Sequence, residues 1–129
     1  MSKVMMKLGP LTFSLSTAAY ESFQKNTAYR WESQSRFNNG PALQFCGHGE
    51  ESVTLPGVIY PHFQGGLEQI DQMREVAAEG NPLLMVDGKG KLHGKWVIVS
   101  ITEKQTVFFS NGTPRKMEFS LKLKRYFND

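Results

Sequence analysis

One segment near the carboxyl end alternates strictly between apolar and polar residues. Its two interleaved sets are Met117, Phe119, Leu121 and Leu123, and Glu118, Ser120, Lys122 and Lys124. Successive side chains of a β-strand point to opposite faces, so the pattern predicts a strand with one face in a hydrophobic core and the other in polar surroundings. Strands of this kind are typical of an antiparallel sheet that is covered on one side.

Three earlier segments, residues 6–15, 29–35 and 52–60, also show the two-residue period of strands. Pro10 indicates an edge strand or the start of a strand in the first of them, because proline has no N–H to donate. Pro56-Gly57 interrupts the third and predicts a bulge, a bend or the close approach of another backbone. We therefore expect strands that are not all straight.

Helical spacing is clear in one place only. Within residues 67–79 the apolar side chains recur every three or four positions, and Gly80 with Pro82 supplies a stop. A short helical turn is expected over residues 17–25, where two aromatic residues lie three apart. Residues 38–41, Asn-Asn-Gly-Pro, are typical of a turn.

The second half of the chain predicts two hairpins. Residues 83–86 read as a short buried strand, and residues 87–90 as the turn after it. Residues 96–101 are apolar on both faces, so one face can cover the core while the other needs a helix or another subunit. Phe108-Phe109 follows, and residues 110–114 form a strong turn before the alternating strand.

One helix among six or seven strands predicts an α+β fold: a mainly antiparallel β sandwich or open barrel with one flanking helix. The 129 residues fit a single domain, residues 1–129, with 40% hydrophobic and 21% charged residues. The first residues lack the apolar stretch of a signal peptide, and no apolar run reaches the ~20 residues that span a bilayer. The single cysteine excludes an internal disulfide, and we expect a protein made in a reducing cytoplasm, with no membrane partner.

Candidate reactive groups do not form a recognisable catalytic or metal-binding set. Cys46 and His48 could be half of a zinc site, but His62 and His93 stand alone and no second pair has ligand spacing. We read Cys46 as a small buried thiol beside a histidine in a glycine-rich loop. Glu50-Glu51 lies in the same predicted loop and indicates no acid–base pair. The sequence therefore predicts no enzyme, no cofactor and no metal.

Basic residues gather near the carboxyl end: Arg115, Lys116, Lys122, Lys124 and Arg125. This patch is the starting point for an alternative function, a small nucleic-acid-binding β domain. However, the net charge is only +3, and rows of lysine also protect strands from unwanted pairing. We therefore favour a protective or intersubunit role for the lysines. A third alternative, a hydrolytic baseplate enzyme, finds no nucleophile or acid pair.

Several stretches in order resemble the GpU family of tail proteins from contractile-tailed temperate phages and prophages. They are Tyr29-Arg30-Trp31, residues 44–50 (Gln-Phe-Cys-Gly-His-Gly-Glu), residues 53–61, the Gly65-Gly66 helix opening, Phe108-Phe109 with Gly112, Arg115 to Phe119, and Leu121 to Arg125. The resemblance covers nearly the whole chain. Cys46 and His48 stand where the family is expected to have aliphatic and proline residues.

The resemblance implies a structural virion protein that is required for tail assembly and similar in fold to phage tail-tube-type subunits. It implies a ring of copies, six-fold or three-fold, at the junction of baseplate hub and tail tube, contacting neighbouring tube or hub proteins. A tail terminator at the head-proximal end is the alternative. DNA is expected only as passing cargo, and the protein is expected in the virion tail, and in the host cytoplasm during assembly.

Assembly requires exposed contact residues, and aromatic and arginine side chains are the commonest energetic anchors of interfaces. The candidates are Tyr29, Trp31, Trp96, Ile98, Phe108, Phe109, Arg115, Lys122 and Lys124. A core position is the competing interpretation for Trp31 and Phe119, and we favour it for those two. Charge reversal of both Lys122 and Lys124 is expected to impair tail assembly.

Overall fold

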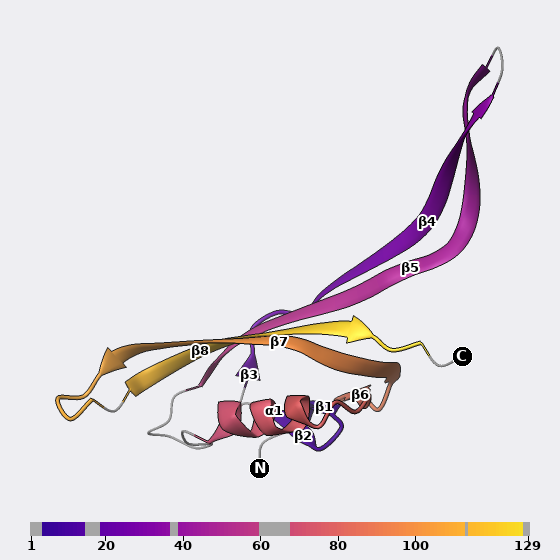
Figure 1. The fold of residues 1–129 in the computed structure, drawn as a ribbon. Helices are drawn as coiled ribbons and strands as arrows, with labels where there is room; N and C mark the ends of the chain where they lie inside the picture. The colour runs from indigo at the N-terminus through magenta and orange to yellow at the C-terminus, as the bar shows by residue number, and fades with distance from the viewer. Residues whose placement is uncertain (1–3, 15–18, 37–38, 60–67, 113, 128–129) are drawn as a thin grey trace.

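The computed structural model describes residues 4–14, 19–36, 39–59, 68–112 and 114–127. These residues form one helix and eight strands, joined in a single sheet (Figure 1). The elements are β1 (Val4–Leu8), β2 (Leu11–Ser14), β3 (Ala19–Tyr20), β4 (Gln24–Arg36), β5 (Asn39–Ile59), α1 (Gln69–Ala78), β6 (Leu83–Asp87), β7 (Leu92–Phe108) and β8 (Pro114–Arg125). All pairings are antiparallel, in the order β2-β1-β6-β7-β8-β5-β3, and β4 also pairs with β5.

The alternating segment is the central strand of this sheet. β8 pairs with β5 on one side and with β7 on the other. The four apolar side chains from Met117 to Leu123 are buried, as the alternation predicts, and Lys122 and Lys124 are exposed on the opposite face. The register of β8 therefore sets the core face for both of its neighbours.

The sheet curls until its two ends meet, which is the open barrel among the two forms expected. The Phe13 ring of β2 lies 6.1 Å from the Tyr20 ring of β3 and 6.4 Å from the Phe119 ring of β8, measured between centroids. The Tyr20 hydroxyl also donates to the Met5 carbonyl oxygen of β1 at 3.4 Å. Contacts across the barrel therefore join its first strands to its last.

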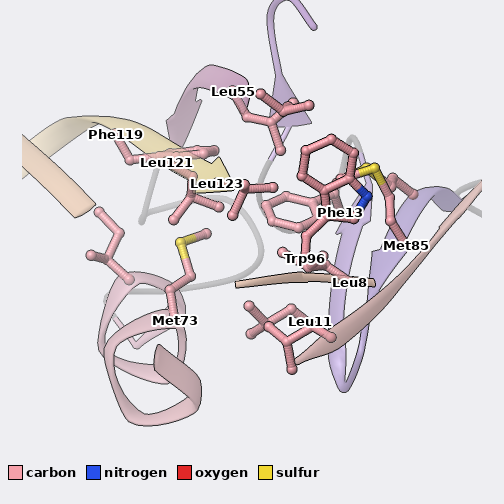
Figure 2. Close-up of a cluster of buried hydrophobic side chains, with 14 of the residues drawn as sticks. Leu8, Leu11, Phe13, Leu55, Met73, Met85, Trp96, Phe119, Leu121 and Leu123 are labelled. Atoms are coloured by element: carbon pink, nitrogen blue, oxygen red, sulfur yellow. The ribbon is translucent and has the colours of Figure 1, made fainter. Parts of the chain in front are cut away.

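Inside the barrel is one hydrophobic core (Figure 2). The helix covers its open side and contributes Ile70 and Met73, both buried. The largest core side chain is Trp96 of β7, which is fully buried and donates its indole N–H to the His93 carbonyl oxygen at 3.0 Å. A buried indole needs such a partner, and this hydrogen bond fixes the orientation of the ring.

Pro56-Gly57 marks a close backbone approach, one of the three outcomes expected there. A Cβ on Gly57 would meet the Ala19 carbonyl oxygen and the Phe119 ring. Gly57 pairs with Tyr20 of β3 on one side and with Phe119 of β8 on the other. The glycine therefore allows three strands to pack tightly.

Several sequence-based expectations are wrong in detail. The helical turn expected over residues 17–25 is replaced, from Ala19 on, by β3 and the start of β4. The expected strand over residues 6–15 is a hairpin, β1 and β2, that turns at Gly9 with a φ of 58°. Asn39 to Pro41 belong to β5 rather than to a turn, and β6 exposes Leu84, so it is buried on one face only.

The helix, the β6–β7 hairpin and the turn before β8 agree with their predictions within the described residues. Gly80, with a φ of 72°, follows the helix as expected. Leu15, Asn38, Tyr60, His62 and the expected start of the helix at residue 67 lie outside the described residues.

Candidate assembly interface

The outer parts of β4 and β5 form a long two-stranded arm that leaves the barrel (Figure 1). We call residues 27–36 of β4 with residues 39–51 of β5 the arm. Every described side chain of the β4 half, through Ser35, is exposed. The predicted glycine-rich loop around Cys46 is wrong, because residues 46–50 lie in this strand and Gly47, with a φ of 104°, sits beside a register shift. Bulges of this kind bend a strand without ending it.

One face of the arm is aromatic. Tyr29 pairs with His48 and Trp31 with Phe45, with ring centroids 5.8 Å and 5.0 Å apart, and Ser33 pairs with Leu43. Directly paired residues of two strands lie on the same face, so these side chains form one stripe. Four of the apolar members remain at least half exposed: Tyr29 56%, Trp31 57%, Leu43 67% and Phe45 50%.

The opposite face of the arm is polar. Glu32 pairs with Gln44 across the strands, and the Gln34 side chain donates to Gln44 Oε1 at 2.9 Å. The arm is therefore an amphipathic ribbon. Two strands alone are marginally stable in water, and an exposed apolar stripe usually marks a contact surface. Trp31 lies here rather than in the core, so its expected core position is wrong, whereas Phe119 is buried as expected.

Ion pairs and cation–π contacts hold the arm where it joins the barrel. Lys25 Nζ lies 3.5 Å from Glu51 Oε1, and Arg125 Nη1 lies 3.5 Å from Glu51 Oε2. Both cations also lie over the Trp96 ring, at 5.9 Å and 5.7 Å from its centroid. Glu51 is only 15% exposed, so its two partners offset the cost of its burial. These contacts orient the arm relative to the barrel.

The β7–β8 hairpin ends in a second apolar surface. Val107, Phe108 and Phe109 are 56%, 53% and 43% exposed, and the Arg115 guanidinium lies 5.1 Å from the Phe109 ring centroid. Val107 has a φ of 54°, which is unfavourable for a β-branched residue. Strain of this kind gathers at functional turns. Three of the predicted candidates, Phe108, Phe109 and Arg115, therefore come together at one exposed tip.

A groove of about 410 Å³ lies between α1 and β7. Its apolar lining includes Ala77 and Ala78 of the helix and Ile98, Val99 and Ile101 of the strand. Val99 is the extra residue where the register of β7 shifts, which explains why it is 49% exposed. The other predicted candidate of this strand, Ile98, is partly buried against the core and contributes to the wall of the groove.

A charge pair closes one end of this groove. Arg74 Nη1 lies 2.7 Å from Glu103 Oε1, and Arg74 is itself 47% exposed. A hydrogen bond from Gln105, and then the Arg74 guanidinium, hold the pKa of Glu103 below its usual value. The groove is therefore apolar along its floor and carries a fixed cation at its rim.

Lys122 and Lys124 project from the polar face of the sheet among hydroxyl residues. Their cross-strand partners include Thr54 and Ser100 for Lys122 and Ser52 for Lys124. Lys124 Nζ pairs with Glu50 Oε1 at 3.2 Å, and Lys116 lies 3.9 Å from Glu118 on the same strand. Acidic residues are thus interspersed with the predicted basic patch.

Trp96 was predicted as a contact residue, and its position corrects that prediction. Its side chain is fully buried in the protein's own core, so a neighbour cannot contact it. The sequence showed residues 96–101 to be apolar on both faces, but it did not show that the bulge at Val99 turns one of these side chains outward. The expectation of a small buried thiol is also only partly met, since Cys46 is half-buried and lies on the arm.

A smaller cavity of about 240 Å³ lies beside β1 and the β6–β7 turn, lined by Met6, Tyr20, Phe23, Asp87 and His93. Asp87 accepts hydrogen bonds from His93 Nε2 at 3.1 Å and from the backbone N–H groups of Lys89 and Lys91 at 2.9 Å each. These bonds, that from His93 first, lower the pKa of Asp87. Burial, with a smaller effect of Asp87, raises the pKa of Tyr20. The carboxylate is fully used in holding the turn.

Within the described ranges, His, Cys, Asp and Glu side chains form no group of three that could hold a metal ion. The same residues include no helix long and apolar enough to cross a membrane.

The sequence model of the Phage P2 GpU family matches residues 9–128. The chain belongs to this family. Over 126 residues, 96% of its length, it is also 30% identical to a protein of Halomonas phage phiHAP-1 named "Probable tape measure protein". The chain spans only 14% of the length of that relative.

Solved structures with a similar fold come from tail assemblies. A chain in the tail of an empty GTA particle, refined with C6 symmetry, has a TM-score of 0.54 at 13% identity, covering 97% of this chain and 92% of that one. A chain of the sheath–tube complex of the PVC extracellular contractile injection system has a TM-score of 0.53 at 12% identity, covering 95% and 85%. The expected tail-tube-type fold is confirmed. Family and fold are those of structural components of contractile tails, and the protein is a phage tail structural protein.

Sequence reasoning missed part of the arm. Leu43 and Phe45 were not among the candidates, although they complete the aromatic stripe with Tyr29 and Trp31. The signal available was the apolar spacing of Leu43 and Phe45, two apart as in a strand, but the adjoining Asn-Asn-Gly-Pro and Gly-His-Gly segments favoured loops.

Proposed function

We propose that this protein is a non-enzymatic structural subunit that assembles with copies of itself into a ring at the junction of baseplate hub and tail tube. The observation that carries the proposal is the amphipathic arm, because a subunit that worked alone would leave this aromatic face in water. Its groups engage in packing and ion pairing, and assembly by complementary surfaces needs no reactive residue.

The exposed area of the chain supports association. A compact monomer of 14.6 kDa exposes about 6,900 Å². This chain exposes 8662 Å², roughly 1,750 Å² more. A standard stable interface buries about 800 Å² on each partner, and a ring subunit has two neighbours. The excess is therefore about what two such contacts would cover.

Free strand edges provide a second means of association. In the described residues, β4 pairs with β5 alone, and β7 beyond Trp96 pairs with β8 alone. Unpaired edges can hydrogen-bond to a strand of another molecule, which gives affinity through the main chain and specificity through side chains. In a ring the two edges must be different surfaces, so that each copy binds the next in the same sense. The C6 symmetry of the similar GTA tail agrees with such an arrangement.

The place of the ring in the tail is tested by immunogold electron microscopy of purified tails, with an antibody against this protein. We expect label at the baseplate end. Label at the head-proximal end would instead support a tail terminator. If the tails carry no label and mass spectrometry finds no copies in the virion, the protein is a transient assembly factor and the structural proposal is wrong.

Nucleic-acid binding is the second candidate, favoured by Lys122 and Lys124 on one exposed face. The pairing of Lys124 with Glu50 weakens it, because phosphate contacts require unneutralised cations. Fluorescence anisotropy with duplex DNA decides between them. We expect no binding that weakens with salt and disappears in the Lys122→Glu, Lys124→Glu double variant. Such binding would support the nucleic-acid function.

A further inference from the structure

The aromatic stripe of the arm continues the core face of the barrel. Along β4 the residues at every second position are Lys25, Thr27, Tyr29 and Trp31. Lys25 pairs with Val53, which is buried in the core, and the register shifts further out add their extra residues on the β5 side. Alternation along β4 is therefore unbroken, and the face that the barrel buries becomes the exposed stripe on the arm. A core face that leaves its own domain needs a cover from elsewhere.

The arm cannot cover itself on its own barrel. It points away from α1, which lies on the far side of the barrel (Figure 1). The ion pairs of Glu51 with Lys25 and Arg125 hold it in this direction. The stripe is thus available only to another molecule.

The length of the arm fits a neighbour of the same size. From Thr27 to Arg36, at about 3.4 Å per residue, the arm reaches about 30 Å. A compact domain of this chain length has a radius of gyration of about 14 Å, and hence a width of about 35 Å. The arm can therefore cross most of one adjacent copy and reach a surface on its far side.

The groove between α1 and β7 is the apolar surface that fits this occupant. It is open, about 410 Å³ in volume, and lined by Ala77, Ala78 and Val99. A pocket of this size accepts one or two large side chains, and the small alanine side chains let a ring approach the helix backbone. The Arg74 guanidinium at its rim can stack on an aromatic face.

We propose that the aromatic stripe of one copy, centred on Trp31 and Phe45, lies in the groove between α1 and β7 of the neighbouring copy. This inference rests on the proposed self-assembly and adds the two surfaces that meet. The contact joins different patches of two identical chains, so it propagates in one direction around a ring. It also covers the exposed apolar parts of both surfaces.

Cys46 provides a direct test, because it is the only cysteine of the chain and lies next to Phe45 on the arm. A single substitution, Ala78→Cys, places a second thiol in the groove. Tails that contain this variant are purified and treated with a short bis-maleimide. We expect a covalent dimer, and a ladder of higher multimers, on denaturing gels. Val99→Cys serves as the second variant if Ala78→Cys is not incorporated into tails.

Two matched controls define the result. Ala78→Cys combined with Cys46→Ser should give no cross-link, since the arm thiol is lost. Lys122→Cys, on the opposite face of the sheet, should give at least tenfold less dimer. If groove variants are present in tails as multiple copies and give no more dimer than Lys122→Cys, the arm–groove contact is wrong while the proposed self-assembly stands. If tails contain no more than one copy of the protein, both are wrong.

Discussion

At the scale of single residues, the structure separates two tryptophans that look alike in the sequence. Trp96 is fully buried, and Trp31 is 57% exposed. We expect Trp96→Ala to lower the free energy of unfolding by about 3–5 kcal/mol, because it leaves a large cavity. Trp31→Ala should lower it by less than about 1 kcal/mol, since it loses mainly one ring contact with Phe45. Urea unfolding measures both.

The functional effects of these two substitutions should differ in the opposite sense. Trp31→Ala should abolish tail assembly while the protein remains folded, and Trp31→Tyr should restore part of it. Normal numbers of tails from Trp31→Ala would show that the aromatic stripe is not a contact surface.

Gly57 is a residue whose role follows from space alone. Gly57→Ala should destabilise the fold by about 1–3 kcal/mol, because the new methyl group meets the Ala19 carbonyl oxygen and the Phe119 ring. Gly40→Ala is the matched control, since nothing lies within 4 Å of its Cβ position. Thermal unfolding of both variants measures the difference, and equal melting temperatures would contradict the tight packing at Gly57.

The hydrogen bonds to Asp87 predict an acid sensitivity. The pKa of Asp87 is lower in the folded protein than in the unfolded chain, so its contribution to stability is complete above about pH 4–5 and is lost as the pH falls through the folded-state pKa. Asp87→Asn should therefore make stability depend less on pH below about pH 5. Asp71→Asn, at a carboxylate that is 73% exposed, should leave the acid dependence unchanged. Urea midpoints at several acidic pH values measure this, and parallel curves for Asp87→Asn and the parent protein would exclude the mechanism.

At the scale of elements, the arm is held by few contacts with the barrel, so its orientation depends on them. Glu51→Gln removes one charge between Lys25 and Arg125, and leaves two cations near the Trp96 ring without their anion. We expect lower tail yield with the barrel still folded. Glu50→Gln, at a carboxylate that is 74% exposed, is the control and should assemble normally. Hydrogen exchange of the arm amides should be faster in Glu51→Gln only, and equal rates in both variants would contradict this anchoring role.

Strict local periods made some elements predictable. The alternation of β8 and the three-to-four spacing of α1 correspond to one covered face each, and both elements appear where expected. Gly80 and the Asp87–Gly90 turn followed from local backbone preferences. Local signals failed where distant contacts decide. Ala19 and Tyr20 form β3 because Val58 and Gly57 offer partners, which no local pattern shows.

The arm shows why the candidate site was only partly predictable. Aromatic residues at positions 29 and 31 indicated a strand face, but alternation does not show whether that face turns inward or outward. The glycines at 47 and 49 favoured a loop, whereas they lie in a bulged strand, and a Cβ on Gly49 would press on the Ala28 backbone. Exposure on the arm is a property of the whole fold, since it depends on where the barrel ends.

At the scale of the whole molecule, an open barrel, a covering helix and a projecting arm form a shape that is incomplete alone. The barrel buries its own core and needs no partner to fold. The arm, the β7–β8 tip and the groove remain exposed and are available for assembly. Stability and assembly are therefore separable in this protein, which is why substitutions in the arm and in the core are expected to have different effects.

The most direct test of self-assembly is cryo-electron microscopy of purified tails. We predict a ring built from copies of this chain, with six-fold or three-fold symmetry, in which each arm crosses an adjacent copy. A single copy on the tail axis, or copies whose arms project into solvent without touching a neighbour, would contradict the account.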